Sequence, residues 1–191
     1  MNQAQHPGRL VLTTEDPYLL PDSPDALLSG LHEIGFIDKA LEQAPGYLLG
    51  DRFMQLVTFM GCSPYIRLEP DGSEEPFCHL RLDGPYPQPK LLQGKNTQPP
   101  RCEACRKRLI SWKTSYESCR ASTNRCKASC PHCGHHQDPV TYDFRQSAGC
   151  GRLFLCVENI FPQEAIPSPA LLEALKRSSN GQTWVYFYQQ E

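Results

Sequence analysis

The sequence predicts an α+β fold, built mainly on an antiparallel sheet with two helices. Most of its apolar runs have the length of a strand, and its 18 prolines and 13 glycines fall mainly between these runs. Two other segments repeat apolar residues at helical spacing behind a Ser-Pro pair. A cysteine-rich segment interrupts this pattern, and we expect it to be an insertion carried by a single α+β body.

The two predicted helices begin with the same signals. Ser23 and Ser168 can each cap a helix by accepting a backbone hydrogen bond, and each is followed by a proline, which suits the first helical position. The apolar stripes are Leu27, Leu28, Leu31 and Ile34 in the first helix, and Leu171, Leu172 and Leu175 in the second. Gly35 and Asn180-Gly181 are expected to end them. The likeness is compatible with an internal repeat, but Ser-Pro caps arise independently so often that we base no function on it.

The other apolar runs are expected to be strands that pair antiparallel. They cover residues 9–13, 53–60, 65–68, 77–82, 140–144, 153–160 and 184–188. Turn residues at 61–64 and 71–72 separate the runs between 53 and 82, so we expect these runs to form a meander. Strands from both ends of the chain are expected to share one sheet, because neither flank alone offers enough apolar positions for a core.

These elements define three expected parts. Residues 1–98 form the N-terminal part of the α+β body, in which 83–98 is a linker because its prolines exclude a helix or a central strand. Residues 99–138 form the cysteine-rich module, and 139–191 form the C-terminal part of the body.

The composition and charge of the chain indicate which cellular compartment and which binding partners to expect. No apolar run approaches the roughly 18 residues needed to cross a bilayer, and the polar start of the chain does not read as a signal peptide. We therefore expect a cytoplasmic protein in which the ten cysteines stay reduced. The formal net charge of −2 alone indicates no strong affinity for nucleic acid or for acidic membranes.

Two Cys-x-x-Cys pairs are the strongest chemical signal. Cys102 and Cys105 form the first pair, and Cys130 and Cys133 form the second. A two-residue spacing lets both sulfurs of one tight turn point at the same ion, and Zn²⁺ takes four such thiolates in a tetrahedron. Four protein ligands leave no open position for water, so we expect a structural zinc site and not a catalytic one.

The segment from about residue 100 to 137 resembles the zinc-ribbon superfamily, in which two knuckles at the tips of β-hairpins clamp one zinc ion. Gly134 follows the second pair, as a turn with positive φ requires, whereas the first pair is followed by Arg106. Iron in a rubredoxin-like site is the alternative metal. Cys119 and Cys126 lie between the pairs and could replace ligands, hold a second ion or be inert, and His132, His135 and His136 are expected to be exposed polar residues.

Other motifs give little sign of an enzyme. The chain has no P-loop, Gly-x-Gly-x-x-Gly, His-Glu-x-x-His or Gly-x-Ser-x-Gly motif. Cys62, Cys78, Cys150 and Cys156 are expected to be buried free thiols, and His79 should face the opposite side of its strand from Cys78. The polar segment 142–152 is expected to be a hairpin with a salt bridge.

Two functions remain. The first is a non-catalytic interaction or regulatory protein whose zinc-stabilised module presents a surface to a protein partner. The second is a nucleic-acid-binding protein that uses the basic side chains of the module, which are Arg101, Arg106, Lys107, Arg108, Lys113, Arg120, Arg125 and Lys127. Against two acidic residues these give the segment a charge of +6 and leave −8 on the rest of the chain. In the second function Trp112 or Tyr116 could stack on a base.

Overall fold

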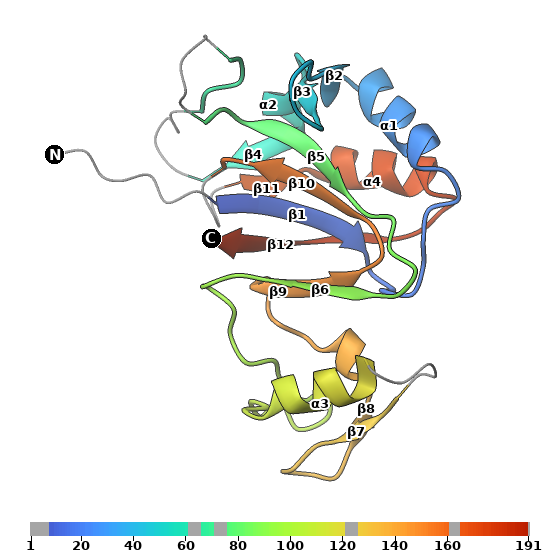
Figure 1. Cartoon of the computed structure of the whole chain (residues 1–191), viewed down its shortest axis with the longest axis vertical. Coiled ribbons are helices and arrows are strands. Elements are labelled where there is room, and N and C mark those ends of the chain that lie inside the picture. Colours follow the sequence, from blue (N-terminus) through green and yellow to red (C-terminus); the bar gives the residue numbers. More distant parts are fainter. Residues whose placement is uncertain (1–7, 61–65, 71–75, 121–125, 161–164, 191) are drawn as a thin grey trace, which may run out of the picture.

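The structure is a computed structural model that describes residues 8–60, 66–70, 76–120, 126–160 and 165–190 (Figure 1). Its helices are α1 (Pro24–Glu33), α2 (Phe53–Leu56), α3 (Trp112–Arg120) and α4 (Pro169–Ser178), with a 3-10 turn η1 (Pro139–Thr141). Its strands are β1 (Gly8–Thr14), β2 (Ile37–Ala40), β3 (Tyr47–Leu49), β4 (Val57–Phe59), β5 (His79–Asp83), β6 (Lys90–Gln93), β7 (Ala128–Ser129), β8 (His136–Gln137), β9 (Ala148–Gly151), β10 (Phe154–Glu158), β11 (Ala165–Pro167) and β12 (Trp184–Gln190). The mixed, mainly antiparallel content agrees with the predicted class, but the described residues form four α-helices where we expected two.

The main sheet has six strands in the order β12-β1-β10-β5-β3-β2. β1 pairs with β10 and β12, so strands from both ends of the chain share one sheet, as expected. The predicted meander is wrong, because β4 pairs with β11 whereas β5 pairs with β10 and β3. The turns proposed for that meander, at 61–64 and 71–72, lie outside the described residues.

The two faces of the sheet bury different partners. Successive strand residues point to opposite faces. Leu10 and Leu12 are fully buried in the cluster that contains Leu27, Leu31 and Leu171 of helices α1 and α4. These two helices pack against each other on that face (Figure 1). Each such leucine contributes on the order of 1.5–3 kcal/mol by leaving water.

Both helix caps form as the sequence predicts. Ser23 Oγ accepts a hydrogen bond from Ala26 N at 3.1 Å, and Ser168 Oγ accepts one from Leu171 N at 3.3 Å. Gly35 at φ +72° follows the end of α1, and Asn180 and Gly181 at φ +58° and +82° follow α4. The predicted start and stop residues therefore bound the helices.

Three predicted strands differ. Residues 53–60 begin as helix α2, because Phe53, Leu56 and Val57 recur at helical spacing and all three are buried. Residues 140–144 begin inside η1, where Asp138 Oδ1 accepts from Val140 N at 2.9 Å and caps a helical turn. Residues 66–68 form no strand, although Ile66 and Leu68 pack on the core, and Tyr65 lies outside the described residues.

The strand pair β6–β9 joins the sheet to the cysteine-rich module. β6 lies inside the segment expected to be a linker, where Leu91 pairs with Cys150 of β9. Leu92 packs with Val11, Phe154 and Phe187 on the second face of the main sheet. Leu91 instead packs on the module. The strand pair β6–β9 therefore forms a layer between the main sheet and the module (Figure 1). None of the helices in the described residues is long and apolar enough to cross a membrane.

Candidate metal centre

The first cysteine pair lies in a tight turn that is closed by an isolated bridge between Arg101 and Arg108. Cys102 N donates to Lys107 O at 3.0 Å, and Arg106 N donates to Cys102 O at 2.9 Å. These bonds wrap the backbone around Cys102 and place Cys105 on the same side of the turn.

The second pair repeats this backbone. β7 and β8 form a hairpin with the cysteines at its tip; Cys130 N donates to His135 O at 2.7 Å and Gly134 N donates to Cys130 O at 2.9 Å. Arg106 and Gly134 occupy equivalent places, with φ +60° and +73°. The unusual residue in the first turn therefore adopts the same left-handed conformation as the glycine in the second.

This equivalence yields a matched pair of substitutions. Gly134→Ala should destabilise the module by about 1 kcal/mol, because a Cβ there meets nothing within 4 Å and only the backbone conformation is penalised. Arg106→Gly should instead stabilise the module, by a similar amount. The measurement is the free energy of unfolding of the metal-loaded protein. Arg106→Ala removes the same charge but keeps the Cβ, so a stabilisation by Arg106→Ala would contradict this explanation.

The four sulfurs converge on one point. Cys102 Sγ lies 3.7 Å from Cys133 Sγ, and Cys105 Sγ lies 3.8 Å from Cys130 Sγ. All four sulfurs lie within 4.8 Å of one another. A tetrahedral ion about 2.3 Å from each thiolate would separate the sulfurs by about 3.8 Å. The donor set and its spacing therefore fit one four-coordinate metal ion.

Backbone N–H groups favour thiolates at this site. Those of Cys105 and Ala104 lower the pKa of Cys102. Burial opposes ionisation of Cys130, but the N–H groups of His132 and Cys133, together with the thiols of Cys133 and Cys102, outweigh it and lower the pKa of Cys130 to about 7. The N–H of His135 favours the thiolate of Cys133, but burial and the thiols of the other three cysteines raise the pKa of Cys133 to about 12. A metal requires deprotonated sulfurs, so the backbone of the turns favours the ligand form at Cys102 and Cys130.

The neighbouring histidines and the two other module cysteines lie outside this group. His132 Nε2 is 3.3 Å from Arg108 O, and His135 Nε2 is 2.6 Å from a carboxylate oxygen of Glu103. Cys119 lies near the end of α3 and Cys126 lies two residues before β7; they form a disulfide with each other, so they are not ligands. Disulfides are rare in reducing compartments, so this bond does not fit the expected cytoplasmic location.

An apolar cluster around α3 joins the module to residues of the flanking segments. Trp112 and Tyr116 are 5% and 3% exposed, and the Trp112 ring meets Phe144 edge to face at 4.9 Å. Tyr116 Oη accepts a hydrogen bond from Leu91 N at 3.0 Å. The hypothesis that Trp112 or Tyr116 stacks on a base is therefore wrong, because both rings already pack inside the protein.

The basic side chains of the module are mostly exposed. Arg101 is half-buried and donates to Arg106 O at 3.4 Å, and Arg120 forms a loose ion pair with Glu117 at 3.8 Å. The exposed ones are Arg106, Lys107, Arg108, Lys113, Arg120 and Lys127, and Arg125 lies outside the described residues. They come from the first turn, helix α3 and the β7 segment.

The thiols away from the centre are inert by burial. Cys78, Cys150 and Cys156 are free and buried, as predicted, and Cys62 lies outside the described residues. Burial raises the pKa of each of these three thiols to about 12. His79 Nδ1 lies 3.1 Å from Phe77 O, so its ring has a backbone partner.

These raised values predict loss of stability in alkali. Well below pH 9.0, the ordinary thiol pKa, both states are protonated and nothing changes. As the pH rises through 9.0 toward 12, the unfolded thiols ionise and the folded ones do not, so stability falls with a slope that approaches about 1.4 kcal/mol per thiol and pH unit. Urea unfolding between pH 9 and 10 measures the slope. Cys156→Ala should make the slope shallower; an unchanged slope would show that Cys156 contributes nothing to it.

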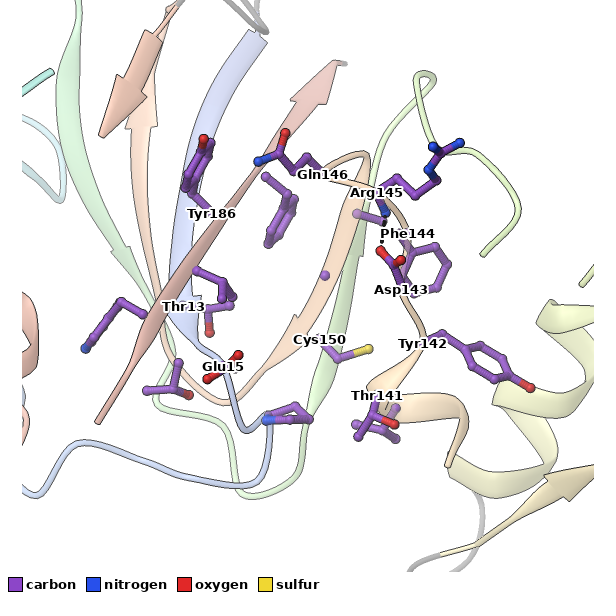
Figure 2. A pocket seen from close by; sticks show the side chains of 18 of the residues that line it. Thr13, Glu15, Thr141, Tyr142, Asp143, Phe144, Arg145, Gln146, Cys150 and Tyr186 are labelled. Carbon is purple, nitrogen blue, oxygen red and sulfur yellow. Dashed lines mark hydrogen bonds between the residues drawn. The ribbon is translucent and has the colours of Figure 1, made fainter. Parts of the chain in front are cut away.

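The polar segment 142–152 is not a simple hairpin. Asp143 Oδ1 accepts a hydrogen bond from Arg145 N at 2.9 Å, where we expected a salt bridge. Arg145 and Gln146 then adopt φ +53° and +62°, and the chain turns into β9. This turn forms one wall of a cleft of about 480 Å³ against β12 (Figure 2).

No family model, curated protein or solved structure matches this chain. Fold alone does not determine function, so function is inferred from the chemistry of the four cysteines and of the surfaces around them. The zinc ribbon therefore remains a resemblance of the segment that contains these cysteines.

Proposed function

We propose that Cys102, Cys105, Cys130 and Cys133 bind one structural Zn²⁺, and that the chain is a non-catalytic interaction protein, regulatory in role, whose metal-stabilised module presents a surface to a protein partner. The observation that carries the metal site is the near-tetrahedral spacing of the sulfurs, 3.7 and 3.8 Å across two pairs. Four thiolates close the coordination shell and leave no position for a substrate or a reactive water.

Zinc is favoured over iron by its affinity. The same tetrahedron of thiolates accommodates both metals, but a given protein site generally binds Zn²⁺ more tightly than Fe²⁺. When bound, the ion would hold the two turns together, and the cysteines would supply all four ligands. The module would then be a zinc ribbon of residues 99–138, inserted between residues 1–98 and 139–191 of one α+β body. The pairing of β1 with β10 and β12 supports this division.

A protein partner is favoured by the exposed side chains of the module. Ile110 is 72% exposed in the loop before α3, and the exposed Arg108 lies two positions earlier in the sequence. The core of a protein interface is more apolar than the rest of the surface, and arginine is enriched at interfaces. The aromatic rings that nucleic-acid binding could have used are buried instead.

Nucleic-acid binding is the second candidate, and the exposure of six basic side chains of the module favours it. The test is a titration of the metal-loaded chain with labelled single-stranded and duplex DNA and RNA at 50 and 200 mM salt. Phosphate binding must weaken steeply with salt, by about 10³ or more when six phosphates are contacted. We expect no binding beyond the weak non-specific level. Tight, salt-sensitive binding that Arg106→Glu and Lys107→Glu abolish would replace the protein-partner proposal.

A further inference from the structure

β12 is an edge strand whose outer side is only partly covered. On the side of β12 that faces away from β1, Tyr188 N donates to Gln146 O at 3.0 Å. On the same side, Gln190 O accepts a hydrogen bond from Lys95 N at 3.0 Å. In an edge strand of an antiparallel pair, the backbone N–H and C=O groups of every second residue point away from the neighbouring strand. The N–H and C=O groups of Trp184 and Tyr186 therefore point outward too, and the described part of the chain gives these backbone groups no hydrogen-bond partner.

The uncovered stretch opens into the cleft of about 480 Å³. Figure 2 shows the segment 141–146 diverging from β12 below Gln146, so that the two walls separate. Thr13 and Cys150, from β1 and β9, lie in the floor. Trp184 and Tyr186 span about 7 Å along the strand, which is enough for about three residues of an extended peptide to pair with them.

The open end of the cleft is acidic. Glu15 points into it, whereas the guanidinium of Arg145 is directed away from β12 (Figure 2). A second hollow of about 430 Å³ shares Glu15, Pro17 and Thr141 with the first and adds Asp16 and Asp138. Its lining also contains Lys127, so carboxylates exceed cations there by three to one.

We propose that this cleft binds an extended segment of a partner protein, which pairs as an added strand with Trp184 and Tyr186 of β12 and places a lysine or arginine beside Glu15. Unsatisfied edge groups give affinity by main-chain hydrogen bonds, and side-chain contacts give specificity. The proposal rests on the proposed function and extends it, because it gives the partner of that interaction protein a second contact, on β12 of the body beside the module. It locates the partner at the junction of module and body, since segment 141–146 packs on α3 through Phe144 and Trp112.

The test uses a displayed library of random twelve-residue peptides, selected on the metal-loaded full chain. The tightest binder, made synthetically with a fluorescent label, is then titrated against variants. Tyr186→Pro removes the outward N–H, and Tyr186→Thr removes the same ring but keeps the N–H. Glu15→Lys reverses the charge in the cleft, and Glu173→Lys, at an exposed position of α4, is its control.

We expect selected peptides that are rich in β-branched residues and carry a basic residue. Tyr186→Pro should weaken binding about ten-fold relative to Tyr186→Thr, since one backbone hydrogen bond is lost. Glu15→Lys should weaken it several-fold, Glu173→Lys should not, and the peptide should protect the amides of Trp184 and Tyr186 from hydrogen exchange.

Other outcomes overturn the proposal. Selection of no binder, equal binding by the two Tyr186 variants, or protection confined to the module would each exclude the cleft as the peptide site. Protection of the same amides by self-association would make a second copy the occupant. Metal content is measured on every variant, so a chain that binds peptide at the module and keeps its zinc would contradict this inference and leave the proposed function standing.

Discussion

Replacing Cys102 and Cys130 with serine together is expected to abolish metal binding and unfold the module while leaving the main sheet folded. Each turn then keeps one sulfur, which cannot complete a tetrahedron. Structural zinc in small modules supplies about 10–16 kcal/mol of folding free energy at pH 7, more than any packing contact here. Amide spectra and bound zinc measure the two effects separately.

The control for this double variant is Cys119→Ser with Cys126→Ser. It removes the same number of cysteines from the module, but these two form a disulfide and are not members of the four-sulfur group. We expect full metal content with a modest loss of stability. Loss of zinc in the control, or retention of zinc and fold in the Cys102 and Cys130 variant, would contradict the assignment of ligands.

Trp112→Ala is expected to have the second largest effect, a destabilisation of about 3–5 kcal/mol. The ring is 5% exposed, packs edge to face on Phe144 and lies in the cluster that contains Cys102 and Cys130. Removing it leaves a cavity in the cluster that contains two of the metal ligands. Urea unfolding of the metal-loaded protein is the measurement, and Trp112→Phe should cost less because it keeps an aromatic ring.

The same variant separates a core role from a nucleic-acid role. If Trp112 were a surface ring that stacks on bases, Trp112→Ala would lower nucleic-acid affinity and leave stability almost unchanged. A change in stability below about 1 kcal/mol would contradict the packing described for α3.

Local signals in the sequence predicted the parts of the fold that depend on local chemistry. The caps at Ser23 and Ser168 act on residues three positions away, and both form. The spacing of Cys102 and Cys105 likewise defines a turn within a few residues, and the pairing of the two turns follows from the need for four ligands. Such signals do not depend on the rest of the chain.

Helix α3 was missed although its signal is present. Trp112, Tyr116 and Cys119 are buried at helical spacing. Basic residues adjacent in sequence suggested instead that the aromatic rings bind nucleic acid. In addition, no Ser-Pro pair marks the start of this helix. The α2 segment was missed for a related reason, because a short apolar run such as 53–60 is compatible with strand or helix until its packing is known.

The disulfide and the cleft lay beyond sequence reasoning. Six residues between Cys119 and Cys126 indicate neither pairing nor its absence, and the end of α3 brings the sulfurs together. The cleft forms where the segment 141–146 no longer covers the outer edge of β12. Locating it requires knowledge of the register of β12 and of the turn at Arg145 and Gln146. Both are set by contacts between distant parts of the chain.

The metal content and coordination of the purified chain test the central proposal most directly. Elemental analysis combined with X-ray absorption at the zinc edge should show one zinc per chain, surrounded by four sulfurs at about 2.3 Å. Absence of stoichiometric metal, or a coordination shell that contains nitrogen or oxygen ligands, would contradict the proposal that these four cysteines bind a structural zinc ion.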